Sequence, residues 1–442
     1  SGRDSVRLSA TVADATDWKA LDEITAHGSN EHMDWLTDSI TVGVLRSIAR
    51  RQTVGVARGS LAGARSLAAL KALLEAEQAF RRNAWDSAQR AAERAIEIDS
   101  NFALAYYWAS FARGWSHGAG ESLSVVYAVR AEALNHGLSP RDSFLIAAND
   151  MMDDASRCGV PALLAAGNAS VIRYPDDPQI WNNLGEIRVH CGLGRSVGVS
   201  ARAALDPFAR AIALDSSFAP AYVHSVELAL EADGISTGLQ YAHAYLARNR
   251  ADGDEPLARL AIARFGRPVD TAAARRLADS ASPRGVGSAA LALGAIPDSA
   301  ETEEWLGQIL VRRIGLMTPV WQAPQNQGPP PAAFVMDGLF RRGHLHQAWS
   351  RLSLFAQGRS LSAVLSGTPT ILLSLAELNV MPTAVVDSVL RTDYNLRHGW
   401  SRVGLRWWAA RSDTVDLERF LAARTTQVGH PDASELQPAT LD

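Results

Sequence analysis

The stretch RAIEIDSNFALAYY (Arg94–Tyr107) is repeated further along the chain as RAIALDSSFAPAYV (Arg210–Val223). Nine of the fourteen positions are identical, and the copies start 116 residues apart. A third version, SVIRYPDDPQIWNNLGE (Ser170–Glu186), lies between them with the same layout and different letters. Each copy has the pattern of the end of one amphipathic helix, a short polar turn and the start of another. Self-similarity of this kind predicts a fold built from repeated helix pairs.

The spacing of the three turns indicates the length of the repeat. Pro175 lies 75 residues after Ser100 and 41 residues before Ser216. With a unit of about 34 residues, these intervals are two units and one unit, each with about seven residues inserted. The chain is therefore expected to consist of stacked helix pairs from Leu61 onward, with strands only before that point.

The middle copy carries a family resemblance. Two short patterns, W-x2-L-G and A-x3-F-x2-A, are formed by Trp181, Leu184, Gly185, Ala204, Phe208 and Ala211. They resemble the tetratricopeptide family, in which small residues let paired helices approach closely and large ones fill the space beside them. The resemblance implies a mainly α fold, a tetratricopeptide-like α-solenoid, with Trp181 buried between two helices of its own unit.

The first sixty residues have a different pattern. Apolar residues alternate over Asp4–Asp14, follow helical spacing over Met33–Arg51, and form a second short strand pattern over Thr53–Ser60. The predicted order is strand, helix, strand, which gives a small N-terminal α/β domain. The helix carries a D-W-L-x-D-x-I-T motif, formed by Asp34, Trp35, Leu36, Asp38, Ile40 and Thr41. It resembles the small domain of TolB-amino-terminal-like and FlgO-like proteins.

Together the two resemblances imply the repeat region of a bacterial multi-domain regulator of the membrane-anchored serine/threonine kinase type. Such regions usually lie outside the cytoplasmic membrane, so we expect a periplasmic or extracytoplasmic location, with the cytoplasm as the alternative. The kinase motifs HRD and DFG do not occur in the sequence, and no Gly-rich loop is followed by a strand lysine. We therefore expect a signalling or membrane-associated assembly protein that is not itself an enzyme.

Pattern changes along the chain predict its domain boundaries. Residues 1–60 form the small domain, 61–265 the clear repeats and 266–424 degenerate helical repeats with a Pro-rich break at 317–334. Residues 425–442 are a polar tail. The formal net charge of −4 gives no indication of nucleic-acid binding. No run of 18 apolar residues occurs, so we expect no membrane span in this chain, although it fits a membrane-attached assembly.

Three motifs suggest catalysis or metal binding, and the sequence around each of them argues against that function. Gly194–Gly198 matches the G-x-S-x-G nucleophile elbow, but no strand is predicted before its serine. His344 and His346 point to different faces of a helix, without a third ligand nearby. The acidic run Asp252–Glu255 lacks a twelve-residue calcium loop. We therefore expect no catalytic residue, no cofactor and no metal.

The two cysteines, Cys158 and Cys191, fall on neighbouring helices of the repeat layout. A disulfide between them would fit an oxidising compartment, and two buried thiols are the alternative. Among the twelve tryptophans, Trp400, Trp407 and Trp408 form a cluster that could pack inside the fold, dock a partner or cap the end of the solenoid.

The repeat pattern also predicts where a partner binds. The first helix of each pair lines the concave wall of such a solenoid. The side chains expected to face that groove are Tyr107, Phe111, Gln179, Asn182, Asn183, Glu186, Val223 and Glu227. Aromatic and amide groups together suit an extended peptide, so we expect a protein–protein interaction scaffold or sensor. A structural accessory subunit and a small-ligand sensor are the alternatives.

Overall fold

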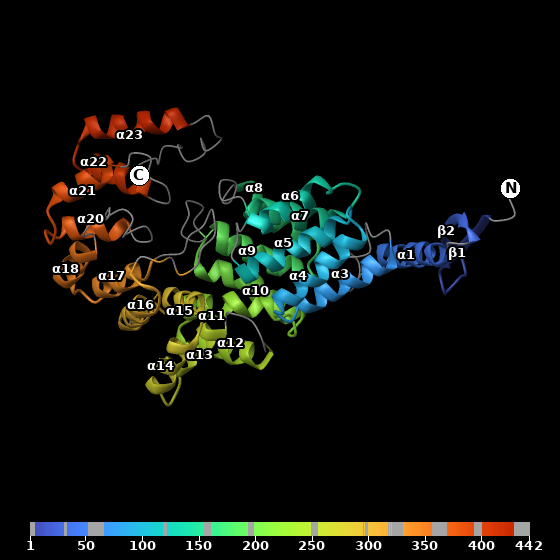
Figure 1. Cartoon of the computed structure of the whole chain (residues 1–442), viewed down its shortest axis with the longest axis horizontal. Coiled ribbons are helices and arrows are strands. Elements are labelled where there is room, and N and C mark those ends of the chain that lie inside the picture. Colours follow the sequence, from blue (N-terminus) through green and yellow to red (C-terminus); the bar gives the residue numbers. More distant parts are fainter. Residues whose placement is uncertain are drawn as a thin grey trace. The chain divides into compact units, whose positions relative to one another are not determined.

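The computed structural model of the 442-residue chain is mainly helical, with a two-stranded sheet near its start (Figure 1). This confirms the predicted fold class. The structure describes residues 5–30, 33–51, 66–117, 122–153, 161–192, 199–248, 255–294, 296, 299–316, 318, 320, 330–355, 369–392 and 400–427. The chain divides into two compact units, one before and one after the Phe265–Gly266 bond.

The small N-terminal domain differs from the expected strand–helix–strand order. Strand β1 (Ser5–Ala13) pairs with an antiparallel strand β2 (Ala20–Ser29), and helix α1 (Met33–Arg51) follows. The sequence did not predict β2, because Asp22 and Gly28 interrupt the apolar residues on its inner face. The expected strand at 53–60 lies outside the described residues.

A tight turn and a close helix contact complete this domain. The Asp14 carboxylate accepts hydrogen bonds from the Thr16 amide, at 2.8 Å, and from its hydroxyl, at 2.5 Å. Gly43 of α1 lies so near the sheet that a β-carbon there would stand 2.4 Å from a methyl of Ile24. Glycine therefore sets how closely α1 approaches β2.

The rest of the first unit consists of helix pairs joined by short turns. In chain order the helices are α3 (Leu67–Phe80), α4 (Trp85–Ile98), α5 (Ala103–His117), α6 (Ser122–Ala133), α7 (Pro140–Asp153), α8 (Pro161–Arg173), α9 (Pro178–Gly192), α10 (Ala201–Leu214), α11 (Pro220–Ala232), α12 (Ile235–Arg248) and α13 (Glu255–Phe265). Consecutive helices pack against each other as in tetratricopeptide-like repeats, and one apolar core runs from α3 to α11.

The repeated stretch folds into the same turn each time. After α4, the Asp99 carboxylate accepts from the Asn101 amide at 3.1 Å, and after α10, Asp215 accepts from the Ser217 amide at 2.9 Å. A side chain in the first turn of the next helix, six residues after the turn residue, then bonds back to the carbonyl of that residue. The three versions are Tyr106 hydroxyl to Ser100 carbonyl at 3.3 Å, Trp181 indole to Pro175 carbonyl at 2.8 Å, and Tyr222 hydroxyl to Ser216 carbonyl at 3.0 Å.

This turn corrects the expectation for Trp181, which is only partly buried. Its place is taken by tyrosine in the other two copies, because the position needs a ring with a polar tip that can reach the turn carbonyl. The tight packing lies four residues later, at Gly185. A β-carbon on Gly185 would stand 2.5 Å from the Phe208 ring of α10, so the glycine of the W-x2-L-G pattern is required for contact between α9 and α10.

The first unit also contacts itself over a long distance in sequence. Arg81, just after α3, forms an ion pair with Asp215, in the turn between α10 and α11. The Ala219 amide donates to the Arg81 carbonyl at 3.1 Å, and the Arg81 guanidinium lies over the Phe218 ring, 5.1 Å from its centroid. We call these interactions of Arg81 with Asp215, Phe218 and Ala219 the closing contact. It joins the first helix pair of the unit to the turn before α11.

The second unit is also built of helix pairs. Its helices are α14 (Thr271–Ser280), α15 (Pro283–Gly294), α16 (Ala300–Ile314), α17 (Pro331–Arg341), α18 (Leu345–Phe355), α20 (Pro369–Glu377), α21 (Thr383–Thr392), α22 (Trp400–Ala410) and α23 (Thr414–Gln427). Helices α16 and α17 pack most closely, since a β-carbon on Gly338 would stand 2.7 Å from the Ala300 carbonyl oxygen. Helices α22 and α23 form the last helical hairpin, with its turn at Ser412–Asp413.

Trp407 and Trp408 lie in the core of the second unit. The Trp407 indole donates to the Asp387 carboxylate at 2.7 Å. Of the three alternatives for these two rings, packing inside the fold is therefore the one that the structure supports. The side chain of Trp400 is outside the described part of the structure.

Candidate functional site: the inner face of the first unit

Helices α5, α9 and α11 place the predicted groove residues in the interior of the first unit. Seven of them are buried, namely Tyr107, Phe111, Gln179, Asn182, Asn183, Glu186 and Val223, and Glu227 is partly buried. The open concave wall that the repeat pattern predicts is thus a filled interior here. The physical reason is the closing contact at Arg81, which the spacing of apolar residues along one helix does not reveal.

Aromatic rings fill the part of this interior next to α3 and α5. Phe80 lies 4.9 Å, centroid to centroid, from each of Trp85, Trp108 and Phe111, and Trp85 stacks on Trp115 at 4.9 Å. These contacts are ordinary core packing. They favour the structural interpretation of Phe111 over its role as an anchor for a partner.

The inner face of α9 is polar, and several of its buried polar atoms lack a hydrogen-bond partner. Six buried side-chain atoms on this helix have no hydrogen-bond partner: Gln179 Nε2, Asn182 Oδ1 and Nδ2, Asn183 Oδ1 and Nδ2, and Glu186 Oε1. Folded proteins pair nearly all buried polar atoms, so such a concentration on one helix face marks a place where another group can bind. Tyr107 of α5 lies beside Gln179, and burial raises the pKa of its hydroxyl, which therefore stays protonated.

A charged pocket adjoins this polar face. The Arg141 guanidinium of α7 binds the Asp177 carboxylate at 2.6 Å and the Asp142 carboxylate at 3.0 Å. Burial alone would lower the pKa of Arg141, but the charges of Asp177 and Asp142 raise it above its usual range. Burial likewise opposes ionisation of Asp177, while Arg141 and two backbone amides hold its pKa below its usual range. Both groups are therefore charged at neutral pH.

The pocket itself has a volume of about 20 Å³ and is lined by Glu77, Arg81, Trp108, Arg141, Asp177, Pro178 and Gln179. A single water needs about 10–15 Å³ measured in this way, so the pocket as it stands holds one water and no larger ligand. Sequence reasoning missed Arg141. An arginine in the first turn of an inner helix was nevertheless an available signal.

A cluster of two histidines and two glutamates lies at the far end of the polar face. Glu186 Oε2 is 3.3 Å from His190 Nε2 and 3.6 Å from His224 Nε2. Glu227 Oε1 is 2.5 Å from His224 Nδ1. The sequence predicts no metal ligand, and these four residues are far apart in it or interpreted only as groove residues. The i, i+4 pair on α9 was an available signal, whereas the approach of His224 from α11 depends on the packing of the repeats.

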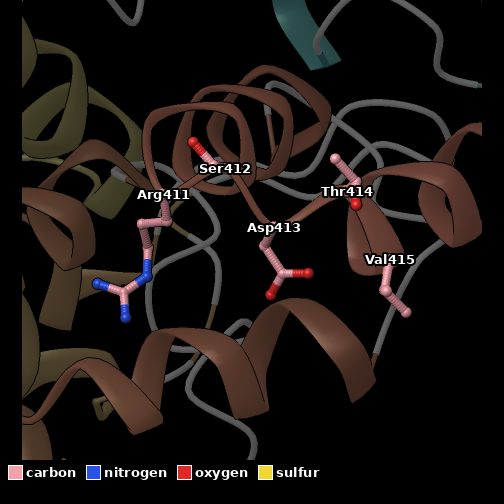
Figure 2. Close-up of a pocket in the computed structure, with 5 residues that line it drawn as sticks. All are labelled: Arg411, Ser412, Asp413, Thr414 and Val415. Carbon is pink, nitrogen blue, oxygen red and sulfur yellow. The ribbon is translucent and has the colours of Figure 1, made fainter.

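Other predicted features give no comparable site. Cys191 is buried and disulfide-bonded, and its predicted partner Cys158 lies outside the described residues, as do most of Gly194–Gly198 and Asp252–Glu255. A surface hollow at the turn between α22 and α23 is lined by Arg411–Val415, whose side chains point in different directions (Figure 2). Asp413 caps α23 by accepting from the Asp416 amide at 3.1 Å, so this hollow is explained by the helix turn.

No helix within the described ranges is long and apolar enough to cross a membrane.

No protein-family model matches the chain, and no curated protein matches it. Among solved structures, human IFIT1, solved as a dimer with PPP-AAAA, is similar over 74% of this chain and 80% of its own, with 12% identity and a TM-score of 0.33. The APC/C hetero-tetramer Cut9–Hcn1 includes a chain that is similar over 81% of this chain and 82% of its own, with 12% identity and a TM-score of 0.29. Similarity at this level does not indicate what the present chain binds.

Proposed function

We propose that this chain is a protein–protein interaction scaffold or sensor module, and that the inner face of α9 binds an extended peptide of its partner. The observation that supports this proposal is the row of unpartnered side-chain atoms from Gln179 to Glu186. Primary amides offer both donors and acceptors, which match the alternating N–H and C=O groups of an extended peptide backbone.

Peptide entry requires the interior to open, because the pocket beside Gln179 has a volume of only about 20 Å³. We expect the interior to open at the closing contact, since this contact depends on one arginine, Arg81, whose side chain is 20% exposed. The binding-competent state is then a minor open form of the free protein. The apparent affinity for a peptide should be reduced by the fraction of molecules in that form.

A small-ligand sensor is the second candidate. The charged pocket around Arg141 favours it, because guanidinium, carboxylate and amide groups line it together and suit a small polar molecule that both donates and accepts hydrogen bonds. In that case Arg141, rather than Asn182 and Asn183, would dominate binding.

Binding experiments on the full chain distinguish these candidates. Peptides selected from a random library displayed on phage would be labelled, and their affinity measured by fluorescence anisotropy. We expect Asn182→Ala with Asn183→Ala to weaken binding at least tenfold, Arg81→Ala to speed association, and the exposed-amide control Asn101→Ala to change neither. If the double variant binds the selected peptides as well as the unmodified chain does, the peptide site is not on α9.

The setting of this module is also a proposal. We propose that it belongs to an extracytoplasmic part of a bacterial signalling or membrane-attached assembly. The disulfide at Cys191 supports an oxidising compartment, since such bonds rarely persist in the reducing cytosol. Fractionation of cells that produce the full-length native protein, followed by thiol labelling of Cys191, tests this proposal. Recovery with cytosolic markers and a reactive thiol would contradict it.

A further inference from the structure

We infer that Glu186, His190 and His224 form a binding site for a divalent transition-metal ion, and that Zn²⁺ is the ion that suits it. One ligand atom from each residue lies within 4.8 Å of the other two. Glu186 and His190 are one turn apart on α9, and His224 comes from α11, the first helix of the next pair. An ion at this point would connect two successive repeats.

The distances within the cluster fit a shared ion better than direct hydrogen bonds. Glu186 Oε2 lies 3.3 Å from His190 Nε2 and 3.6 Å from His224 Nε2. Hydrogen bonds from N–H to oxygen are usually about 2.7–3.2 Å long. Around a tetrahedral Zn²⁺ with bonds of about 2.0–2.1 Å, neighbouring ligand atoms are about 3.3–3.4 Å apart. The edge from Glu186 to His190 matches this length, and the edge from Glu186 to His224 is 0.2–0.3 Å longer, so a small movement of the side chains would bring these atoms around one ion.

Glu227 prepares His224 to act as a ligand. Its Oε1 lies 2.5 Å from His224 Nδ1, so Nδ1–H donates to this carboxylate and the lone pair of Nε2 points to the cluster. A carboxylate that fixes the tautomer of a ligating histidine in this way is a common feature of zinc sites. Glu227 is thus a positioning residue and not a ligand.

The surroundings of the cluster suit a bound ion with one open position. The Glu186 side chain is only 3% exposed, and its Oε1 has no partner. The Trp115 and Phe208 rings lie against the His224 ring, with centroids at 5.6 Å and 5.8 Å. The His190 side chain is 48% exposed, so the ion can enter from solvent, and water can occupy the fourth position.

The repeat register shows that packing at these two positions does not require an imidazole. Counted from the shared turn, His190 stands at the same position as Trp115 of α5, and His224 at the same position as Trp108. Indoles fill both positions in the earlier repeat. A metal site explains why imidazole and carboxylate groups stand at positions where the earlier repeat has aromatic side chains. Two imidazoles and one carboxylate are typical Zn²⁺ ligands.

The site can be tested with metal ions alone. The untagged full chain would be stripped with a chelator and titrated with Zn²⁺ against a chromophoric competitor. We expect one Zn²⁺ per chain, affinity lowered at least tenfold by His190→Ala, and no change from His243→Ala, which removes an exposed histidine from α12. Because His190 is half exposed, circular dichroism should show that the first variant keeps its fold. Titration with Co²⁺ should give the visible absorption bands of a tetrahedral complex.

A second variant tests the positioning role. Glu227→Gln should weaken Zn²⁺ binding by about 10–100-fold while retaining one ion per chain. If the unmodified chain binds no Zn²⁺, or if His190→Ala binds as tightly as the unmodified chain, the proposal is overturned. No peptide is used in this experiment, so its result is independent of the proposed peptide site.

Discussion

The Arg81 guanidinium and the Asp215 carboxylate form an ion pair although the two residues are 134 positions apart in the chain. Burial alone would raise the pKa of Asp215, but hydrogen bonds from the Ser217 hydroxyl and amide and the charge of Arg81 lower it. Asp215 therefore stays ionised at neutral pH. This pair and the cation–π contact of Arg81 with Phe218 hold the inner face of α9 closed.

Removing the closing contact should loosen the whole first unit. We expect Arg81→Ala to lower the free energy of unfolding by about 1–3 kcal/mol, because a partly buried, charge-assisted pair is lost. Urea denaturation measures this change, and limited proteolysis should show faster cleavage in the α10–α11 turn. The neighbouring exposed Arg82→Ala is the control and should be neutral within about 0.5 kcal/mol. Equal behaviour of the two variants would show that the contact does not hold the unit together.

A second test concerns the glycine of the repeat motif. Gly185→Ala should destabilise the first unit by about 1–3 kcal/mol, because the new β-carbon would stand 2.5 Å from the Phe208 ring. Gly114→Ala on α5 is the matched control. No atom lies within 4 Å of the β-carbon at that position, so alanine should instead stabilise the helix by about 0.5–1 kcal/mol. Thermal unfolding of the two variants should therefore shift in opposite directions, and a shift of the same sign would contradict the close contact.

The side-chain amides of α9 that lack hydrogen-bond partners lead to a prediction about the free energy of unfolding. Asn182→Leu should raise the free energy of unfolding by about 1–3 kcal/mol, since a buried amide without a partner is replaced by an apolar side chain of similar size. The same change at exposed Asn101 should have little effect. Urea denaturation measures both. A loss of stability in Asn182→Leu would mean that the amide is satisfied in solution and that α9 has no spare hydrogen-bonding capacity.

The second unit should be sensitive to alkaline pH. Burial, followed by the charge of Asp337 and a hydrogen bond with it, raises the pKa of Glu303 from 4.5 to about 9, against the opposing effect of Arg341. Because the folded state binds this proton more tightly than the unfolded state, its contribution to stability is complete below about pH 4.5 and is lost as the pH rises through about 9.

Hydrogen exchange of the α16 and α17 amides, followed across this pH range, measures that effect locally. Opening free energies should fall as the pH rises in the unmodified chain, after correction for intrinsic exchange rates. Glu303→Gln stays neutral and should remove most of the slope, whereas exposed Glu301→Gln should retain it. A slope that persists in Glu303→Gln would assign the pH dependence to other groups.

The sequence predicted the helix pairs well because their signals are local. The shared turn at Asp99 and Asp215, and the contact between Gly185 and Phe208, are encoded within a few dozen residues. Strand β2 was missed because its inner face is short of apolar side chains. Trp181 is less buried than predicted because its indole N–H donates to the carbonyl of the turn.

The candidate site was predictable only in part. The residues of α9 were expected to line a concave groove, and the structure buries them, because helical periodicity does not distinguish an open wall from a filled interior. That difference depends on the long-range contact of Arg81. The approach of His224 to Glu186 likewise depends on how two helices that are separated in the chain by α10 pack together.

In an open row of repeats each unit is held only by its neighbours, so the terminal units fray first and unfolding can spread inward. The contact of Arg81 with the turn before α11 gives the first helix pair a second neighbour from far along the chain. A fragment that ends with α10 would lose that neighbour, and with it the His224 ring that lies against Trp115. The stretch from α3 to α11 should therefore unfold as one cooperative block, and shortening it from either end should weaken both ends at once.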